Sequence, residues 1–241
     1  MYMENKILLV IVEGQSDEYS LAPALTQIVP KKVKFKVMRG DIIGDNDSTP
    51  ENIERRIKEQ GVKKFLEKNQ EFTYSDICEV VHITDMDGVY IPDESVIVND
   101  SLNDVAYFDD HIEVNSDKYD RVLNSRKNRR AILNHLISLK TIAIPHGIVV
   151  PYQIYYMSCN LDHVTVNKLN ADKDKKLDLA MKFGDDYDDP VKFYEFFNDL
   201  ELKVSDDYLK SWEYIKLDHN SLQRHSNLNV LLDKYIGDYL F

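Results

Sequence analysis

The chain has 241 residues, 43% of them hydrophobic, and it includes 15 tyrosines and 9 phenylalanines. This is enough apolar material for one large domain, or for a medium domain with an appendage, and it excludes a disordered chain. The formal net charge of −12 at pH 7 argues against passive, sequence-independent wrapping of nucleic acid, which relies on a broad basic surface. An enzyme that meets phosphates through a bound metal and a small basic patch remains compatible with this charge.

The cysteines and the apolar runs indicate where the protein resides. Cys78 and Cys159 form no C-x-x-C or Cys/His metal spacing, and two thiols are too few for a disulfide scaffold. Glu13 interrupts the apolar run 7–12 far short of a signal-peptide core or a membrane span. We therefore expect a cytoplasmic protein with no membrane contact.

The first third of the chain alternates between strand and helix patterns. A continuous apolar run is typical of a strand that is covered on both faces of a parallel sheet, and apolar stripes at helical spacing lie between such runs. The predicted elements are a strand at 6–12, a helix at 16–28 ended by Pro30, a strand at 33–37, a helix at 51–66 and a strand at 80–84. This order predicts an α/β fold with a mainly parallel sheet, right-handed crossovers and flanking helices.

The rest of the chain is less regular. Residues 89–117 form an irregular excursion with room for a hairpin, 118–139 regain helical spacing, and 147–157 read as a fourth strand. After Asn170 the composition shifts toward Lys, Asp and aromatic residues in helical stripes, which we interpret as packing surfaces. The predicted organisation is an α/β domain over 1–170, with an insertion at about 89–117, and a helical C-terminal appendage over 171–241 that packs on it.

Acidic residues follow two of the predicted strands. Asp85 and Asp87 leave the third strand with their side chains on the same side, because strand side chains repeat every two residues. Two converging carboxylates repel each other unless a cation lies between them, and Mg²⁺ prefers such oxygen ligands. An acidic turn is the alternative, since Asp and Gly are common in turns. Glu13 follows the first strand, and ligands of open α/β sheets gather at these carboxyl ends, so the sequence favours a metal site.

Two motifs in this order resemble a known family. They are Val12-Glu13-Gly14-Gln15-Ser16-Asp17 and Asp85-Met86-Asp87-Gly88. The pair is similar to the signature of the Toprim domain, in which a glutamate follows the first strand and Asp-x-Asp follows the third. Topoisomerases, primases, recombination proteins and OLD-type nucleases share this domain. The form of the first motif is most like the OLD-type and small nuclease branch, and the match extends to about residue 160. The resemblance implies a Toprim-like, Rossmann-like fold.

The resemblance also implies a function. It implies that Glu13, Asp85 and Asp87 are the catalytic residues and hold Mg²⁺ or Mn²⁺, with Glu13 as general base in an alternative assignment. Asp17 is either a further metal ligand or a helix-capping acid. The implied activity is metal-dependent cleavage or nicking of DNA or RNA. No topoisomerase tyrosine and no Gly-x-x-x-x-Gly-Lys-Ser/Thr motif is present. This leaves a nuclease that acts alone or with a separate partner such as an ATPase, in defence against mobile elements by analogy.

Other candidate site residues lie farther along the chain. The basic cluster within 126–130 either contacts nucleic-acid phosphates or forms a solvated helix face; its members are Arg126, Lys127, Arg129 and Arg130. His163 is either an accessory acid or base or a packing residue at a helix start. Ser158 and Asp162 are accessory candidates through their predicted position after the fourth strand.

Two other functions are compatible with the sequence. The stretch 84–89 also resembles motif one of haloacid-dehalogenase phosphatases, with Asp85 as the nucleophile, and 184–189 resembles that family's late acidic motif. Two strand–helix units precede the first motif, however, and residues 177–183 favour a helix over the strand that this family requires. The third hypothesis is a non-catalytic interaction module, in which the acids are structural and the aromatic helical region binds a partner.

Overall fold

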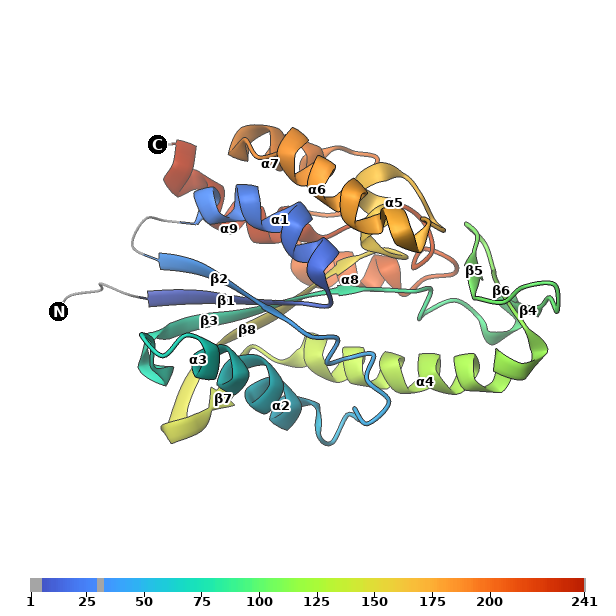
Figure 1. Cartoon of the computed structure of the whole chain (residues 1–241), viewed down its shortest axis with the longest axis horizontal. Coiled ribbons are helices and arrows are strands. Elements are labelled where there is room, and N and C mark those ends of the chain that lie inside the picture. Colours follow the sequence, from blue (N-terminus) through green and yellow to red (C-terminus); the bar gives the residue numbers. More distant parts are fainter. Residues whose placement is uncertain (1–5, 30–32, 241) are drawn as a thin grey trace.

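A five-stranded mixed sheet with helices on both faces forms the centre of the protein (Figure 1). The computed structural model describes residues 6–29 and 33–240, so Pro30, the predicted helix stop, lies outside the described residues. The strand order is β2-β1-β3-β8-β7. Their bounds are Lys6–Val12 for β1, Val33–Arg39 for β2, Ile77–Asp85 for β3, Thr141–Ile144 for β7 and Ile148–Met157 for β8.

The apolar run at the start of the chain forms a central strand, as predicted. β1 pairs in parallel with β2 on one side and with β3 on the other, and β3 pairs in parallel with β8. Side chains of β1 alternate between two cores: Leu9 and Ile11 pack on one face, and Leu8 and Val10 on the other. Because both faces are covered, the strand needs apolar residues at every position.

One strand of the five-stranded sheet was not predicted. β7 runs antiparallel to β8, with Ile144 opposite Ile148, so the sheet is mixed. Ile142 and Ile144 of β7 are buried, whereas Thr141 and Ala143 are exposed, which is the alternation of an edge strand with one covered face.

The helices form two layers, one on each face of the sheet (Figure 1). α1, α6, α7 and α9 lie on one side, and α2, α3 and α4 lie on the other. Trp212 and Ile215 of α8 join the core on the α4 side. The bounds are Gln15–Ile28 for α1, Ile53–Arg56 for α2, Lys64–Lys68 for α3, Ser116–Ser138 for α4, Leu161–Val166 for α5, Lys176–Asp186 for α6, Pro190–Asn198 for α7, Tyr208–Ile215 for α8 and Leu228–Leu240 for α9.

The helix predicted at 51–66 contains a wide turn. A π-helical segment, Ile57–Lys63, joins α2 to α3. Gly61 in this segment lies against β1, and a Cβ there would be 2.6 Å from Ile11 Cδ1. The missing side chain therefore lets the helix approach the sheet closely. Short 3₁₀ turns at Tyr74–Asp76, Asp93–Ser95, Pro145–Gly147 and Lys173–Lys175 complete the helical elements.

The excursion predicted at 89–117 forms a second, small sheet beyond the carboxyl ends of β1 and β3 (Figure 1). Its strands are β4 (Val96–Val98), β5 (Ala106–Tyr107) and β6 (Ile112–Val114), in the order β4-β6-β5. β5 and β6 pair antiparallel, as in a hairpin, whereas β4 and β6 are parallel. The small sheet packs on its own core, which includes Cys159 and Leu222 from later in the chain.

The C-terminal helices complete the two main cores. Phe183, Phe193 and Leu228 pack with β1 side chains on the α1 face, while Trp212 packs on the opposite face. Ser226 forms backbone bridges with Met157 at the end of β8 and with Lys203. Within the described ranges, no helix combines the length and hydrophobicity that crossing a membrane requires.

The close crossing of α1 and α6 depends on Gly184. A Cβ at this position would lie 2.2 Å from the Tyr19 carbonyl oxygen, which is backbone and cannot rotate away. We expect Gly184→Ala to lower the free energy of unfolding by about 1–3 kcal/mol in urea titrations, because the two helices must separate. The matched control is Gly237→Ala in α9, where a Cβ meets nothing within 4 Å and should stabilise the helix by about 0.5–1 kcal/mol. Equal stability of the Gly184→Ala variant and the wild type would contradict this account.

Candidate functional site

The structure brings Glu13, Asp85 and Asp87 together at the carboxyl edge of the sheet. Glu13 directly follows β1 and Asp85 ends the neighbouring parallel strand β3. The Asp85 backbone N–H donates to Glu13 Oε1 at 3.0 Å, and the Thr84 hydroxyl donates to the same oxygen at 2.6 Å. Residues 72 positions apart are thus joined directly.

A tight turn after β3 positions the two aspartates. The backbone N–H groups of Met86 and Asp87 donate to the Cys159 carbonyl at 3.0 and 2.7 Å. Asp87 has φ 46° and Gly88 has φ 62°, so the chain enters the left-handed region, which Asp tolerates better than most residues and Gly adopts freely. The Leu161 N–H at the start of α5 donates to Asp85 Oδ1 at 3.0 Å.

Arg129 of α4 bridges the acids. Its Nη2 donates to Glu13 Oε1 at 2.8 Å and its Nη1 donates to Asp87 Oδ2 at 2.7 Å. Nη2 also donates to the Asp85 carbonyl at 2.5 Å. The guanidinium side chain is only 11% exposed, so these contacts are shielded from water and stronger than surface ion pairs.

The negative charge of the site exceeds the positive charge of Arg129. Burial, helped by the charges of Asp41 and Asp87 and opposed by Arg129, raises the pKa of Glu13 to about 7. Burial and the charge of Glu13 also hold the pKa of Asp85 well above its usual range. Burial opposes the charge of Arg129, yet Glu13 and Asp87 outweigh it and raise the pKa of the guanidinium. The cluster therefore favours either protons or a further cation.

The donor set suits a divalent cation in its chemistry. Three carboxylates supply hard oxygen ligands of the kind that Mg²⁺ or Mn²⁺ takes. Within the described residues, however, no group of three or more His, Cys, Asp or Glu side chains is arranged to hold a metal ion. Arg129 lies between Glu13 and Asp87. Binding of a cation by Glu13, Asp85 and Asp87 therefore requires their side chains to move away from the bridging guanidinium.

Asp17 lies beside this site in a capping position. Its Oδ2 accepts a hydrogen bond from the Gly14 N–H at 2.7 Å, as the third residue of α1 does in a capping box. Burial, helped by the charge of the nearby Asp162, raises the pKa of Asp17 to about 6. These contacts are those of the capping alternative.

The accessory candidates are buried around α5. Asp162 is 4% exposed and pairs with Lys176 at 3.0 Å. The Ser158 hydroxyl donates to the Asn220 carbonyl at 2.8 Å. Burial lowers the pKa of His163 to about 4, and its ring Nδ1 has no hydrogen-bond partner among the described residues. Asp162 is thus charge-paired near the site, while Ser158 binds backbone.

The basic cluster of α4 mostly faces inward. Arg126 is buried and donates to the Gly88 and Ile91 carbonyls at 3.2 and 2.5 Å. Arg130 donates to the Val89 carbonyl at 3.0 Å. With Arg129 bound to the acids, only the side chain of Lys127 is largely exposed, at 58%, and it lies 3.6 Å from Asp93. The sequence predicts either a nucleic-acid contact or a solvated helix face for all four, whereas in the structure the three arginines hold the turn after β3 and the acids.

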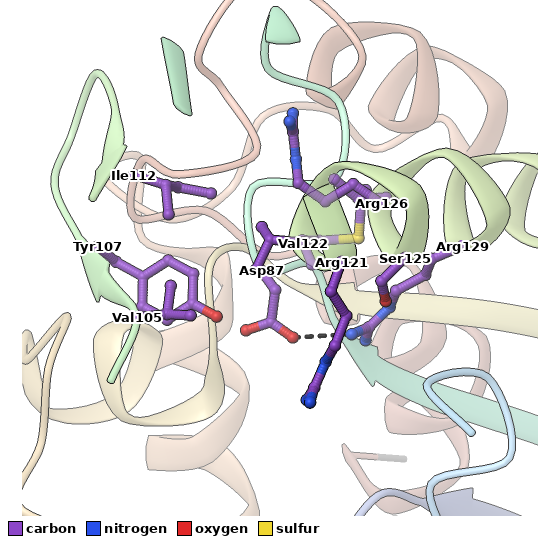
Figure 2. Close-up of a pocket in the computed structure, with 11 residues that line it drawn as sticks. Asp87, Val105, Tyr107, Ile112, Arg121, Val122, Ser125, Arg126 and Arg129 are labelled. Atoms are coloured by element: carbon purple, nitrogen blue, oxygen red, sulfur yellow. Dashed lines mark hydrogen bonds and ion pairs between the residues drawn. The ribbon is translucent and has the colours of Figure 1, made fainter. Parts of the chain in front are cut away.

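Three residues of the site were missed in the sequence. Thr84 donates to Glu13, Lys176 pairs with the buried Asp162, and Tyr107 turns its hydroxyl toward Asp87 (Figure 2). Burial and the charge of Asp87 raise the pKa of Tyr107. Thr84 immediately precedes the Asp-x-Asp pair, so the sequence alone predicts that it lies near the acids. Tyr107 and Lys176 reach the site only through the tertiary fold.

The late acidic stretch at 184–189 is not part of the site. Gly184 lies in α6, as the helical pattern of 177–183 indicated, and Asp185 and Asp186 are exposed at the end of that helix. Lys176, at the opposite end, is the residue of α6 that pairs with Asp162. At 1.5 Å per residue, Asp185 lies about 14 Å along the helix from Lys176.

Comparison with known proteins gives no relative. No protein-family model, no curated protein and no solved structure matches the chain. The site itself places three carboxylates, which are ligand types for a divalent cation, beside one guanidinium at the sheet edge.

The stability of the metal-free protein should depend on the ionisation of Glu13. Its folded pKa of about 7 exceeds its ordinary value of 4.5, so protonated Glu13 stabilises the fold below pH 4.5, and this contribution disappears as pH rises through 7. In EDTA, we expect the wild type to lose on the order of 3 kcal/mol of unfolding free energy between pH 5 and pH 8 from this group.

Glu13→Gln should remove this part of the pH dependence in urea unfolding at both pH values. Asp185→Asn, which removes an exposed acid away from the site, should keep the slope of the wild type. Adding Mg²⁺ at pH 8 should stabilise the wild type in proportion to the logarithm of its concentration. Identical slopes in all three proteins would show that Glu13 ionises normally.

The arginines of α4 that point inward should contribute to the stability of the fold more than to the charge of its surface. Arg126→Met leaves the Gly88 and Ile91 carbonyls without their donor, so we expect a loss of about 1–3 kcal/mol in unfolding free energy. The matched control on the same helix is Lys127→Met, which should change stability by less than about 0.5 kcal/mol because the side chain is exposed. Similar stabilities for the two variants would contradict the structural role of Arg126.

Proposed function

We propose that the protein is a metal-dependent phosphodiesterase with a Toprim-like fold that cleaves or nicks nucleic acid. One observation carries the proposal: the Glu13 carboxylate is hydrogen-bonded to the backbone of Asp85 and linked through Arg129 to Asp87. The α/β fold with parallel β1 and β3 as neighbours supports the Toprim resemblance of the two motifs.

The residues have separate roles in this proposal. Glu13, Asp85 and Asp87 would hold Mg²⁺ or Mn²⁺, which when bound polarises a phosphate and lowers the pKa of a water molecule. Thr84 and the Asp85 N–H orient Glu13 by donating to the same oxygen. Arg129 links Glu13 to Asp87 and holds the two carboxylates in place, and Asp17 fixes the start of α1 behind Glu13.

The biological setting is an inference from the resemblance. The OLD-type proteins that the two motifs resemble suggest a role in cytoplasmic defence against mobile elements, alone or with a separate ATPase. The net charge of −12 is consistent with substrate contact through a local site and not through a general basic surface.

Cleavage assays test the proposal directly. Purified protein is incubated with supercoiled DNA, linear DNA, RNA and a generic phosphomonoester, each with Mg²⁺, Mn²⁺ or EDTA. We expect strand cleavage that requires the metal and falls by about a hundredfold or more in Glu13→Gln and in Asp85→Asn. The control Asp185→Asn, which changes an exposed acid at the end of α6, should cleave like the wild type.

The other functions give different results in the same assay. Phosphomonoester turnover that survives Glu13→Gln would replace the proposal with a haloacid-dehalogenase-like phosphatase that uses Asp85 as nucleophile. Absence of both activity and Mg²⁺ binding, measured by calorimetry, would favour a non-catalytic interaction module.

A further inference from the structure

A small cavity opens beside Asp87, between α4 and the small sheet (Figure 2). Its volume is about 150 Å³. Polar and charged side chains form about half of its wall. The other wall residues are apolar or aromatic and come from the turn after β3, from the small sheet and from α4. These wall residues are Met86, Val89, Val105, Tyr107, Ile112 and Val122.

The size and the lining of the cavity suit one planar ring. A protein cavity of about 150 Å³ is large enough to bind benzene, so this one has the volume for a six-membered ring. The Tyr107 ring offers an aromatic wall, and Arg121 and Ser125 of α4 offer polar groups to the edge of a heterocycle (Figure 2). Aromatic and arginine side chains around a cavity are typical of sites that hold a base outside its stack.

A wider groove of about 610 Å³ adjoins this cavity along α4. Arg121, Ser125 and Arg129 line both spaces, because residues four apart share one face of a helix. The other wall of the groove is the loop 43–49, and Asn124 adds a further polar side chain. Hydroxyl, amide and guanidinium groups of this kind contact phosphates.

Arg121 differs from the other arginines of α4. Arg126, Arg129 and Arg130 all pair with carboxylates, whereas Arg121 is exposed and forms no ion pair within the part of the chain that the structure describes. Its charge is thus available to an anion in the groove, which it lines together with the neighbouring cavity.

We infer that the cavity receives one unstacked base of a single strand of nucleic acid, while the neighbouring phosphates lie along the groove beside Arg121. This inference rests on the proposed function, since it names the form of the substrate. A base paired within a duplex is hidden in the stack and must be flipped out at a cost in free energy. The protein should therefore favour single strands over duplexes.

An abasic scan tests the inference apart from cleavage. The background is Asp85→Asn, which removes the proposed chemistry and keeps an oxygen for the Leu161 N–H. Fluorescence anisotropy measures the affinity of labelled thymidine and uridine octamers, of their duplexes, and of octamers with one abasic residue at each position in turn. We expect duplexes to bind more weakly, and one abasic position to lower the affinity roughly 5- to 150-fold, which is the contribution of stacking one base.

Variants of the wall connect the effect to this cavity. Val105→Trp should fill it and lower the affinity of the single strand roughly tenfold or more. The control Val149→Trp adds the same ring on β8 at a side chain that is 60% exposed, and should bind like the background protein. Tyr107→Phe keeps the aromatic wall and should retain affinity, whereas Tyr107→Ala should lose it, so the test does not depend on one variant.

The results separate this inference from the proposed function. Metal-dependent cleavage by the wild type, combined with a flat abasic scan and no effect of Val105→Trp, would overturn the inference and leave the function standing. A position-dependent abasic scan without cleavage by the wild type would support the cavity and overturn the nuclease proposal. Absence of any binding to single strands would overturn the inference.

Discussion

The arrangement of the site depends on the guanidinium of Arg129. Carboxylates from β1 and from the turn after β3 meet in a largely buried place, where their mutual repulsion is expensive. Arg129 offsets part of this cost by donating to Glu13 and Asp87 and to the backbone of Asp85. Because Arg129 comes from the middle of α4, the same contacts fix that 23-residue helix against the carboxyl edge of the sheet. Three carboxylates still face one guanidinium, so in the metal-free protein the pKa values of Glu13 and Asp85 are raised and protons offset the excess of acids.

The turn after β3 connects the acids to distant parts of the chain. Gly88 sits so close to Leu222 and Ile112 that a Cβ would lie 2.7 and 2.9 Å from their side chains, and its φ of 62° is unfavourable for other residues. Arg126 and Arg130 hold the carbonyls of the same turn from the side of α4. A segment of a few residues therefore joins the acids, the small sheet and the C-terminal region, which explains why the excursion at 89–117 packs instead of extending into solvent.

The sequence was sufficient for the α/β class and for the meeting of Glu13 with Asp85, because both follow from apolar runs that end in acids on parallel strands. β7 was missed since four residues beside a turn carry too little pattern.

The inward direction of the arginines of α4 can be predicted from the sequence. Arg126, Arg129 and Arg130 lie seven residues before the buried Leu133, Leu136 and Ile137, and so continue the apolar stripe of α4, whereas Lys127 precedes the exposed Asn134. The charge of the cluster alone predicts a solvent-facing or phosphate-binding surface, whereas its helical spacing from the buried residues of α4 predicts side chains that face inward. Tyr107 could not be found in this way, because its position beside Asp87 depends on the folding of the small sheet.

The inward arginines also restrict how this acidic protein can bind nucleic acid. A binding mode driven by phosphate neutralisation needs several free cations along the path of the strand. On α4, however, the charges of Arg126, Arg129 and Arg130 already serve carboxylates or carbonyls of the protein itself. For a nucleic-acid strand beside the acids, the positive charge that remains on this helix is that of Arg121, together with that of Lys127, which lies 3.6 Å from Asp93. A divalent cation would supply local charge at the acids, and the rest of the affinity must then come from contacts that do not depend on charge. Stacking and burial of one base in the cavity beside Asp87 is a contact of that kind, which connects the shape of the cavity to the net charge of the chain.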